Sequence, residues 1–245
     1  MSDYIKILGI KINKVNMREA ISEANSFIIN NKKAYIVTPN SEIIVMAQED
    51  KELASIINKS DLSVADGAGV VLASKLYKKP LTERVAGFDL MNRLLKLAVD
   101  ENYSIYFLGG EKGVIEKAKK NILKKYPGIQ ICGVHHGFLD KKKEELVISE
   151  INKLTPEILF LGMGVPRQEK FIQHNRAKIK TNLIMTVGGS FDILAGKSKR
   201  APLWMQKLSL EWLFRLLQEP GRFIRMLALP RFVFLVLIDI LKNRD

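Results

Sequence analysis

Residues 60–75 read SDLSVADGAGVVLASK, and this stretch indicates how the chain folds. A short apolar run ends at Asp66, two glycines follow within three residues, and an apolar helical pattern begins directly after them. A strand that turns through glycine into a helix is the repeating unit of α/β proteins with a parallel sheet. Asp66 then stands at the tip of a strand, where it could either cap the following helix or face a ligand.

The same unit recurs along the chain. Short, nearly continuous apolar runs alternate with longer amphipathic stretches, as expected of buried parallel strands between helices. We therefore predict an α/β fold, with a Rossmann-like, mostly parallel sheet and flanking helices. The opening YIKILGIKINKV (4–15) predicts a β-hairpin or an edge strand. The predicted strands of the main sheet span 34–39, 62–66, 104–110, 129–134, 157–164 and 183–189.

The composition fits one core with an appendage. The chain has 245 residues, of which 47% are hydrophobic, enough to bury a substantial core. The single cysteine, Cys132, cannot form an intramolecular disulfide, which fits a reducing compartment. The N-terminal residues contain no apolar run like that of a signal peptide, and no apolar run reaches the roughly 18–20 residues of a membrane-spanning helix. We therefore predict a cytoplasmic protein.

The charge is strongly basic, with 39 Lys and Arg against 26 Asp and Glu and a net charge of +13. This surplus predicts a polyanionic partner, which could be nucleic acid, an anionic membrane surface or a phosphorylated substrate. Basic runs interleaved with aromatic side chains and RNA-binding signatures are both absent from the sequence. We therefore predict no nucleic-acid partner.

Glycine or short polar residues stand at the ends of five predicted strands. These ends read TPN, DGAG, GG, GMG and GGSFD in chain order. The carboxyl ends of parallel strands share one edge of a sheet, and glycine there lets backbone N–H groups approach a phosphate. One such end would indicate only a tight turn, whereas five together favour a ligand crevice. Gly109, Gly110, Gly188 and Gly189 are among these strand-end glycines.

Several familiar site motifs are absent from the sequence. It contains neither a GxxxxGK[ST] phosphate loop nor a DxD pair, and GMGVPR (162–167) lacks the third glycine of the dinucleotide fingerprint. His135, His136 and His174 have no Cys or carboxylate at the spacing of metal ligands. The sequence therefore predicts neither a metal site nor a bound cofactor.

Polar side chains gather instead at predicted strand tips and helix starts. Thr38 and Asn40 follow the first strand, Asp66 follows the second, and Arg84 and Gln168 stand just before or at the start of helices. Each also has an ordinary explanation. Asn40 could cap a helix, Arg84 could form a surface ion pair, and Gln168 could lie on a helix surface.

The last fifty residues differ from the rest. From Gly196 the strand pattern stops, and the sequence is rich in Leu, Phe, Trp and Arg, with ten Lys or Arg but four Asp or Glu. Such an amphipathic segment fits the interface of a membrane. A helical pair packed on the core or on another subunit is the alternative. We predict an α/β core of residues 1–195 and a helical, amphipathic, membrane-associating appendage of residues 196–245.

Six motifs follow one another along the chain, and they read TPNSEIIVMAQED, SVADGAGVVLASK, ERVAGFDL, FLGG, LFLGMGVPRQEKFI and VGGSFDILAGKSKRAPLWMQKLSLEWLFRLLQEPGR. In their order and spacing, these motifs resemble the WecG/TagA/CpsF family of bacterial glycosyltransferases. The resemblance covers nearly the whole chain. Its most specific part is the C-terminal run from Ala195 to Arg222.

The resemblance implies transfer of an N-acetylhexosamine from a UDP-sugar donor to a polyprenyl-diphosphate sugar acceptor on the cytoplasmic membrane face. The chain looks most like the branch that makes linkage units of wall teichoic acid. That branch transfers N-acetylmannosamine to N-acetylglucosaminyl-diphospho-undecaprenol through a β-1,4 bond. The enterobacterial branch uses the corresponding uronic acid. An α-linked donor and a β-linked product imply inversion, which needs a base.

Under this interpretation Asp66 is the candidate general base. Thr38, Asn40 and Gln168 are expected to hold the sugar. Gly109, Gly110, Gly188 and Gly189 are expected to line the nucleotide. Arginine suits a diphosphate because its planar fork can donate two hydrogen bonds at once. We expect the C-terminal segment to fold over the crevice at the membrane and bring arginines to the diphosphate. The candidate diphosphate ligands are Arg84, Arg215, Arg222 and Arg225.

Other classes of function stay open at this point. A nucleotide-binding oxidoreductase would bind NAD(P), and a non-catalytic membrane adaptor would need the basic C-terminal segment without the polar strand tips. A nucleic-acid binder would explain the net charge and would bind with strong salt dependence. A homo-oligomer also fits, because an apolar C-terminal face suits a subunit interface.

Overall fold

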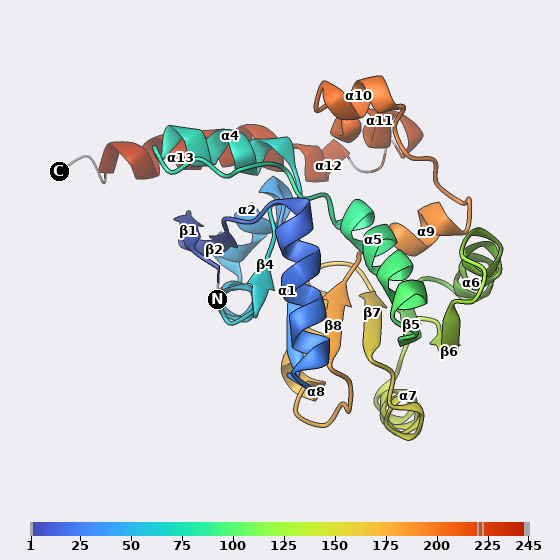
Figure 1. Ribbon diagram of the computed structural model, residues 1–245. Helices are drawn as coiled ribbons and strands as arrows, with labels where there is room; N and C mark the ends of the chain where they lie inside the picture. The colour runs from blue at the N-terminus through green and yellow to red at the C-terminus, as the bar shows by residue number, and fades with distance from the viewer. Residues whose placement is uncertain (1, 220, 222, 243–245) are drawn as a thin grey trace.

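The computed structural model describes residues 2–219, 221 and 223–242, and it contains two sheets (Figure 1). The larger sheet has six parallel strands in the order β4-β3-β8-β7-β5-β6. The predicted α/β class is confirmed, and each predicted strand is present, some of them shortened. The strands are β3 Ala34–Val37, β4 Leu62–Ser63, β5 Ser104–Gly109, β6 Gln130–His135, β7 Ile158–Gly162 and β8 Leu183–Thr186.

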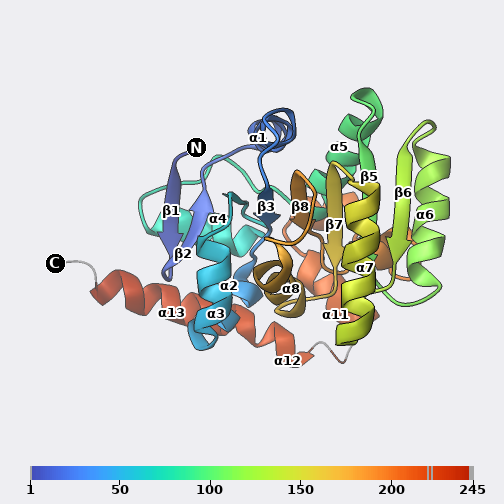
Figure 2. The same ribbon diagram turned by 90° about the horizontal axis from the view of Figure 1, so that it is seen from below.

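Helices cover both faces of the large sheet (Figure 2). Successive side chains of a strand point to opposite faces, so Tyr106 and Leu108 of β5 join one hydrophobic core and Ile105 and Phe107 join the other. The first core is covered by α2, α3, α7 and α8, and the second by α1, α5 and α6. The helices up to the last strand are α1 Met17–Ile29, α2 Ser41–Glu49, α3 Lys51–Asn58, α4 Ala68–Leu76, α5 Gly87–Asp100, α6 Val114–Lys125, α7 Lys141–Leu154 and α8 Arg167–Asn175.

The predicted N-terminal hairpin is confirmed. Strands β1 Tyr4–Ile7 and β2 Ile10–Asn13 pair antiparallel and lie beside the β4 edge of the large sheet. The turn between them consists of Leu8 and Gly9, and both have a positive φ. Two-residue hairpin loops favour this geometry because it matches the twist of the flanking strands.

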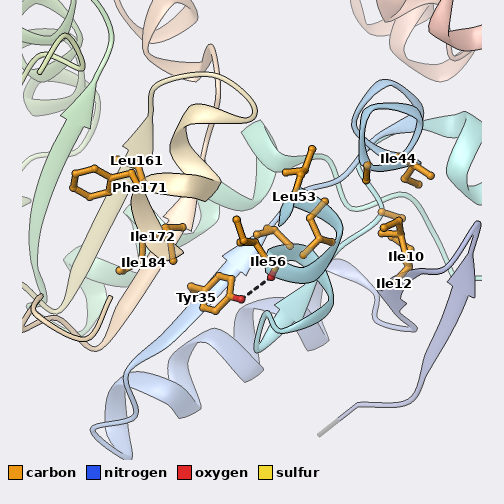
Figure 3. Close-up of a cluster of buried hydrophobic side chains, with 14 of the residues drawn as sticks. Ile10, Ile12, Tyr35, Ile44, Leu53, Ile56, Leu161, Phe171, Ile172 and Ile184 are labelled. Carbon is orange, nitrogen blue, oxygen red and sulfur yellow. Dashed lines mark hydrogen bonds between the residues drawn. The ribbon is translucent and has the colours of Figure 1, made fainter. Parts of the chain in front are cut away.

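Aliphatic side chains attach the hairpin to the first core (Figure 3). Ile10 and Ile12 of β2 are buried in one cluster with Leu53 and Ile56 of α3. At the centre of this cluster the Tyr35 hydroxyl donates a hydrogen bond to the Ile56 carbonyl oxygen at 2.6 Å. A buried hydroxyl needs such a partner, and here it fixes β3 to α3.

The C-terminal segment is helical, as predicted, and it returns to the core. Phe232 and Val236 of α13 are buried in the first core, and Figure 1 shows α13 alongside α4. The Tyr77 hydroxyl, just after α4, donates to an Asp239 carboxylate oxygen at 2.6 Å. The division of the chain at residue 196 stays a prediction. The helices after β8 are α9 Ser190–Leu194, α10 Leu203–Lys207, α11 Glu211–Gln218, α12 Phe223–Met226 and α13 Ala228–Lys242.

No helix in the described part of the chain has both the length and the hydropathy that crossing a bilayer requires.

Strands β5 and β7 approach each other closely at their carboxyl ends. Gly109 pairs in register with Gly162, and its φ is +145°, a backbone angle that residues with a side chain rarely adopt. A Cβ on Gly109 would lie 2.2 Å from the Gly162 carbonyl oxygen. Backbone cannot move aside as a flexible side chain can, so this position requires glycine for packing.

Replacing Gly109 by alanine should lower the free energy of unfolding by at least about 3 kcal/mol, because the new Cβ meets backbone. Gly189→Ala is the matched control. Its φ is −82°, and its nearest neighbour would be an Asp192 carboxylate oxygen at 3.7 Å. Urea denaturation followed by circular dichroism measures both variants. Similar stabilities in the two variants would contradict the close approach of β5 and β7.

Helix α8 directs a carboxyl group into the interior. Glu169 is 2% exposed, and its Oε1 accepts a hydrogen bond from Gln168 Nε2 at 2.8 Å. Its Oε2 has no hydrogen-bond partner among the described residues. Burial disfavours the ionised form and raises the pKa of Glu169 to about 7.

The folded protein therefore binds this proton more tightly than the unfolded chain does. The resulting stabilisation is complete below the unfolded pKa and is lost as the pH rises through about 7, a loss of up to about 3 kcal/mol. Glu169→Gln keeps an oxygen for Gln168 but carries no charge. This part of the pH dependence should vanish in the variant when unfolding is measured from about pH 5 to about pH 8. An unchanged dependence would contradict the assignment to Glu169.

Candidate active site

A cavity of about 410 Å³ opens at the carboxyl edge of the large sheet, where the sequence predicts a ligand crevice. Strand ends form one side of it, and the C-terminal segment forms the other. Parallel sheets of this kind bind ligands at this edge. The strand-end residues include Thr38, Asn40, Asp66, Gly110, Gly164, Gly188 and Gly189. The C-terminal residues include Arg200, Glu211, Arg215 and Arg225.

Asp66 lies between β4 and α4 and faces the cavity. It does not cap the helix that follows it, because Gly67 holds the N-cap position of α4 and no side chain caps that end. The Asp66 carboxylate instead lies against Gly87, the first residue of α5, whose backbone N–H lowers the pKa of Asp66. The helix-cap explanation for Asp66 at α4 is therefore wrong.

The environment of Asp66 favours proton binding. Burial raises the pKa of Asp66 above its ordinary value, although the charges of Arg84 and Arg215 oppose the shift. The Asp66 side chain is 29% exposed, so one side of the carboxylate still meets the cavity. A carboxylate with a raised pKa accepts a proton more readily, which suits a general base.

Arg84 lies between two carboxylates. Its Nη2 is 3.7 Å from Asp66 Oδ1, and it also donates a hydrogen bond to Glu211 Oε2. The surface ion pair considered for Arg84 is therefore an ion pair inside the cavity. Glu211 belongs to α11, so this contact joins the C-terminal segment to the core.

Arg200 fixes the other side of Glu211. The Nε of Arg200 is 3.5 Å from Glu211 Oε1, and its two terminal nitrogens bind Asp89 at 2.5 and 2.7 Å. Its guanidinium also lies over the Phe88 ring, 5.0 Å from the ring centroid. A bidentate pair of this kind is strong and sets geometry as well as charge.

Thr38 and Asn40 both line the cavity after β3. The Asn40 side-chain oxygen accepts a hydrogen bond from the Ile43 backbone N–H at 3.0 Å and caps α2. The ordinary explanation for Asn40 is therefore confirmed. Its amide still carries two donors, so capping leaves hydrogen bonds for a ligand.

Gln168 lines the cavity but is only 2% exposed, so it does not lie on a helix surface. Its Oε1 accepts a hydrogen bond from the Gly188 backbone N–H at 3.1 Å, and its Nε2 donates to Glu169. Both ends of the amide are thus engaged within the protein. Gln168 joins the start of α8 to the loop after β8, and it shapes the crevice through that loop.

The four glycines predicted to line a nucleotide fall into two groups. Gly110, Gly188 and Gly189 line the cavity, whereas Gly109 is not among its lining residues and packs against β7. Gly110 and Gly188 have φ values of +67° and +51°, so each turn favours glycine.

The predicted diphosphate arginines of the C-terminal segment differ in their placement. Arg215 lines the cavity, where its charge acts on Asp66. Arg225 also lines the cavity, and its Nε is 3.7 Å from Glu42 Oε1. Arg222 lies outside the described residues.

Sequence reasoning missed Glu211 and Arg200 as site residues. Their partners Arg84 and Asp89 are 127 and 111 residues away, and no local pattern pairs residues at such separations. The sequence offered one indication for Glu211, which falls within the run APLWMQKLSLEWLFRLLQEPGR (201–222), part of the most specific stretch of the family resemblance.

Among residues 2–219, 221 and 223–242, no three His, Cys, Asp or Glu side chains come together in a way that could hold a metal ion.

Known sequences place the chain in a family. The profile described as "Glycosyl transferase WecG/TagA/CpsF family" matches residues 5–245. A Staphylococcus aureus (strain MW2) protein is 34% identical over 232 residues, which cover 94% of this chain and 91% of that protein. A Bacillus spizizenii protein is 37% identical over 212 residues, or 86% of this chain and 82% of that protein. Both are named N-acetylglucosaminyldiphosphoundecaprenol N-acetyl-beta-D-mannosaminyltransferase. The chain therefore belongs to the WecG/TagA/CpsF family of glycosyltransferases.

Proposed function

We propose that this chain transfers N-acetylmannosamine from UDP-N-acetylmannosamine to N-acetylglucosaminyl-diphospho-undecaprenol, with inversion and a β-1,4 bond. The reaction would serve the synthesis of the linkage unit of wall teichoic acid. The observation that carries the proposal is the match to relatives named for this transfer, which extends over 82–91% of their length. The crevice supports it, because a carboxylate and several arginines meet there.

In the proposed reaction Asp66 is the general base. The acceptor hydroxyl attacks the anomeric carbon of the donor sugar, and its proton passes to the Asp66 carboxylate. The bond between the anomeric carbon and the diphosphate oxygen breaks, and UDP leaves with the electron pair. The raised pKa of Asp66 makes the carboxylate a better proton acceptor than an ordinary surface aspartate.

Arginines and backbone N–H groups would stabilise the charge on the leaving diphosphate. Arg84 and Arg215 lie near Asp66, and Arg225 stands where the cavity meets α2. Arg222 is a further candidate on sequence grounds. The N–H groups of Gly110 and Gly188 already donate to the Gly162 carbonyl oxygen and to Gln168 Oε1, so these two glycines would shape the cavity wall rather than donate to the anion.

The sugar would lie between Asp66 and the end of β3. Thr38 and Asn40 offer hydrogen bonds from that end. Gln168 would act through the loop at Gly188 rather than by direct contact, because its amide is already engaged.

We further propose that the C-terminal segment binds the cytoplasmic face of the membrane. Helix α13 buries Phe232 and Val236 against the core and still presents apolar side chains on its other side. A helix that is apolar all round is stable only when both sides are covered. The net charge of +13 favours an anionic lipid surface. The exposed apolar side chains of α13 are Val233, Phe234, Leu237 and Leu241, and α4 beside it adds Leu72 and Leu76.

The first test measures release of UDP by the full-length chain from UDP-N-acetylmannosamine and a synthetic lipid-diphosphate N-acetylglucosamine, with and without EDTA. Asp66→Asn should reduce acceptor-dependent release by about 10²–10⁴-fold, because the amide cannot take the proton. Asp100→Asn, at the exposed end of α5, should leave the rate unchanged. The melting temperature of each variant checks folding.

Equal release by the wild type and a folded Asp66→Asn variant would remove Asp66 from the mechanism. Release with UDP-N-acetylmannosaminuronic acid alone would keep the reaction class and change the donor. A chain that binds liposomes but turns over no UDP-sugar would be a membrane adaptor. Saturable NAD(P) binding would favour the oxidoreductase.

A second test addresses the membrane. The double variant Phe234→Glu/Leu237→Glu should weaken co-sedimentation with anionic phospholipid vesicles at least about tenfold, because two side chains lose burial. Leu146→Glu is the control, since Leu146 is 63% exposed on α7, which lies across the molecule from α13 in Figure 1. Unchanged vesicle binding by the double variant would contradict the proposal. A change in oligomeric state instead would assign this face to a second copy.

A further inference from the structure

Glu211 competes with Asp66 for one guanidinium. Arg84 Nη2 is 3.7 Å from Asp66 Oδ1 but is in hydrogen-bond contact with Glu211 Oε2. Arg84 therefore gives its stronger contact to a residue of the C-terminal segment. The side chains of Arg84 and Glu211 are 25% and 18% exposed, so water weakens this contact less than it would at the surface.

Two arginines hold Glu211 in place. Arg84 binds one carboxylate oxygen, and Arg200 Nε lies 3.5 Å from the other. Arg200 is itself fixed by its bidentate contact with Asp89 in the first turn of α5. Opposite charges thus alternate from Asp66 through Arg84, Glu211 and Arg200 to Asp89. Because α11 supplies the middle member, the arrangement is complete only when the C-terminal segment is seated.

We propose that Glu211 is a positioning residue that draws Arg84 away from Asp66 and so keeps Asp66 available as a base. This rests on the proposed function of Asp66. Without Glu211, the guanidinium of Arg84 would pair with Asp66 alone. A carboxylate held in such a pair is a weaker proton acceptor, because the adjacent cation favours its ionised form. Seating of α11 would then set the basicity of Asp66 as well as close the cavity.

The charges around Asp66 agree with this direction. Arg84 faces it from the loop before α5, Arg215 and Glu211 face it from α11, and the Gly87 N–H faces it from the start of α5. The positive charges of Arg84 and Arg215 lower the pKa of Asp66, whereas the negative charge of Glu211 raises it. Loss of Glu211 leaves both arginines uncompensated, so the pKa of Asp66 should fall.

Glu211 could have the opposite role and inhibit the reaction by blocking Arg84. If Glu211 only occupied the place of a substrate phosphate on Arg84, its removal would free the arginine and speed the reaction. The two roles predict opposite signs for the same variant, so one experiment separates them.

The experiment compares the pH dependence of kcat in the wild type, Glu211→Gln and Glu211→Asp, using the full chain, the UDP-sugar and the synthetic acceptor. In Glu211→Gln the acid limb should move about one pH unit lower, and the plateau should fall about tenfold. Glu211→Asp keeps the charge and should restore much of the limb. Glu49→Gln is the control, because it removes the negative charge of the carboxylate that lies 2.5 Å from Arg231 of α13 and does not touch Arg84.

A lower plateau of kcat with an unmoved acid limb would show that Glu211 has a purely structural role, which would overturn the proposal. A Glu211→Gln variant with a higher kcat than the wild type would show that Glu211 only blocks Arg84, which would overturn it too. A readout without turnover keeps the inference separate from the proposed function. Proteins labelled with ¹³C at aspartate carboxyls report the titration of Asp66 by NMR, with Asp66→Asn giving the assignment. An identical Asp66 titration in the wild type and Glu211→Gln would overturn the inference even if the enzyme is active.

Discussion

All six strands of the large sheet run in the same direction, and the candidate site depends on this constraint. Parallel strands place every carboxyl end at one edge, where the turns into helices leave backbone N–H groups unpaired. At the end of β5, the backbone of Gly109 lies so close to the backbone of Gly162 in β7 that no side chain fits at Gly109. The sheet can therefore supply only one side of a cavity. The opposite side has to come from another part of the chain, and here it comes from the C-terminal segment.

Features with a local cause could be predicted from the sequence. Continuous apolar runs located the strands, because a strand buried on both faces needs no polar alternation. Glycine after these runs located the crevice, and the helix-capping alternative for Asn40 was correct because capping is a local interaction. Strand ends were less well predicted. The run at 62–66 gives a strand of only Leu62–Ser63, since pairing stops before the apolar residues do.

Features that depend on distant contacts could not be predicted. Gln168 stands beside charged residues in the sequence and suggested a helix surface, yet it is buried, because α8 packs against α3 and the loop after β8 receives its amide. Gly109 looked like a nucleotide contact, and its close neighbour is a backbone 53 residues further along the chain. Asp66 looked like a possible cap for α4 but lies against Gly87 at the start of α5. Local sequence patterns do not show which residues far apart in the chain come into contact.

The charges at the cavity are nearly balanced, although the chain as a whole is strongly basic. An arginine in a half-buried crevice is costly unless a carboxylate pairs with it, and Arg84, Arg200 and Arg225 each have one. A diphosphate that bound these three arginines would exchange with their carboxylate partners, so the number of charge-assisted hydrogen bonds to them would change little. Such an exchange adds little net affinity and selects ligands by geometry. In the reaction that we propose, affinity for a lipid-linked acceptor would then have to come from elsewhere, and we propose the exposed apolar side of α13 as its source.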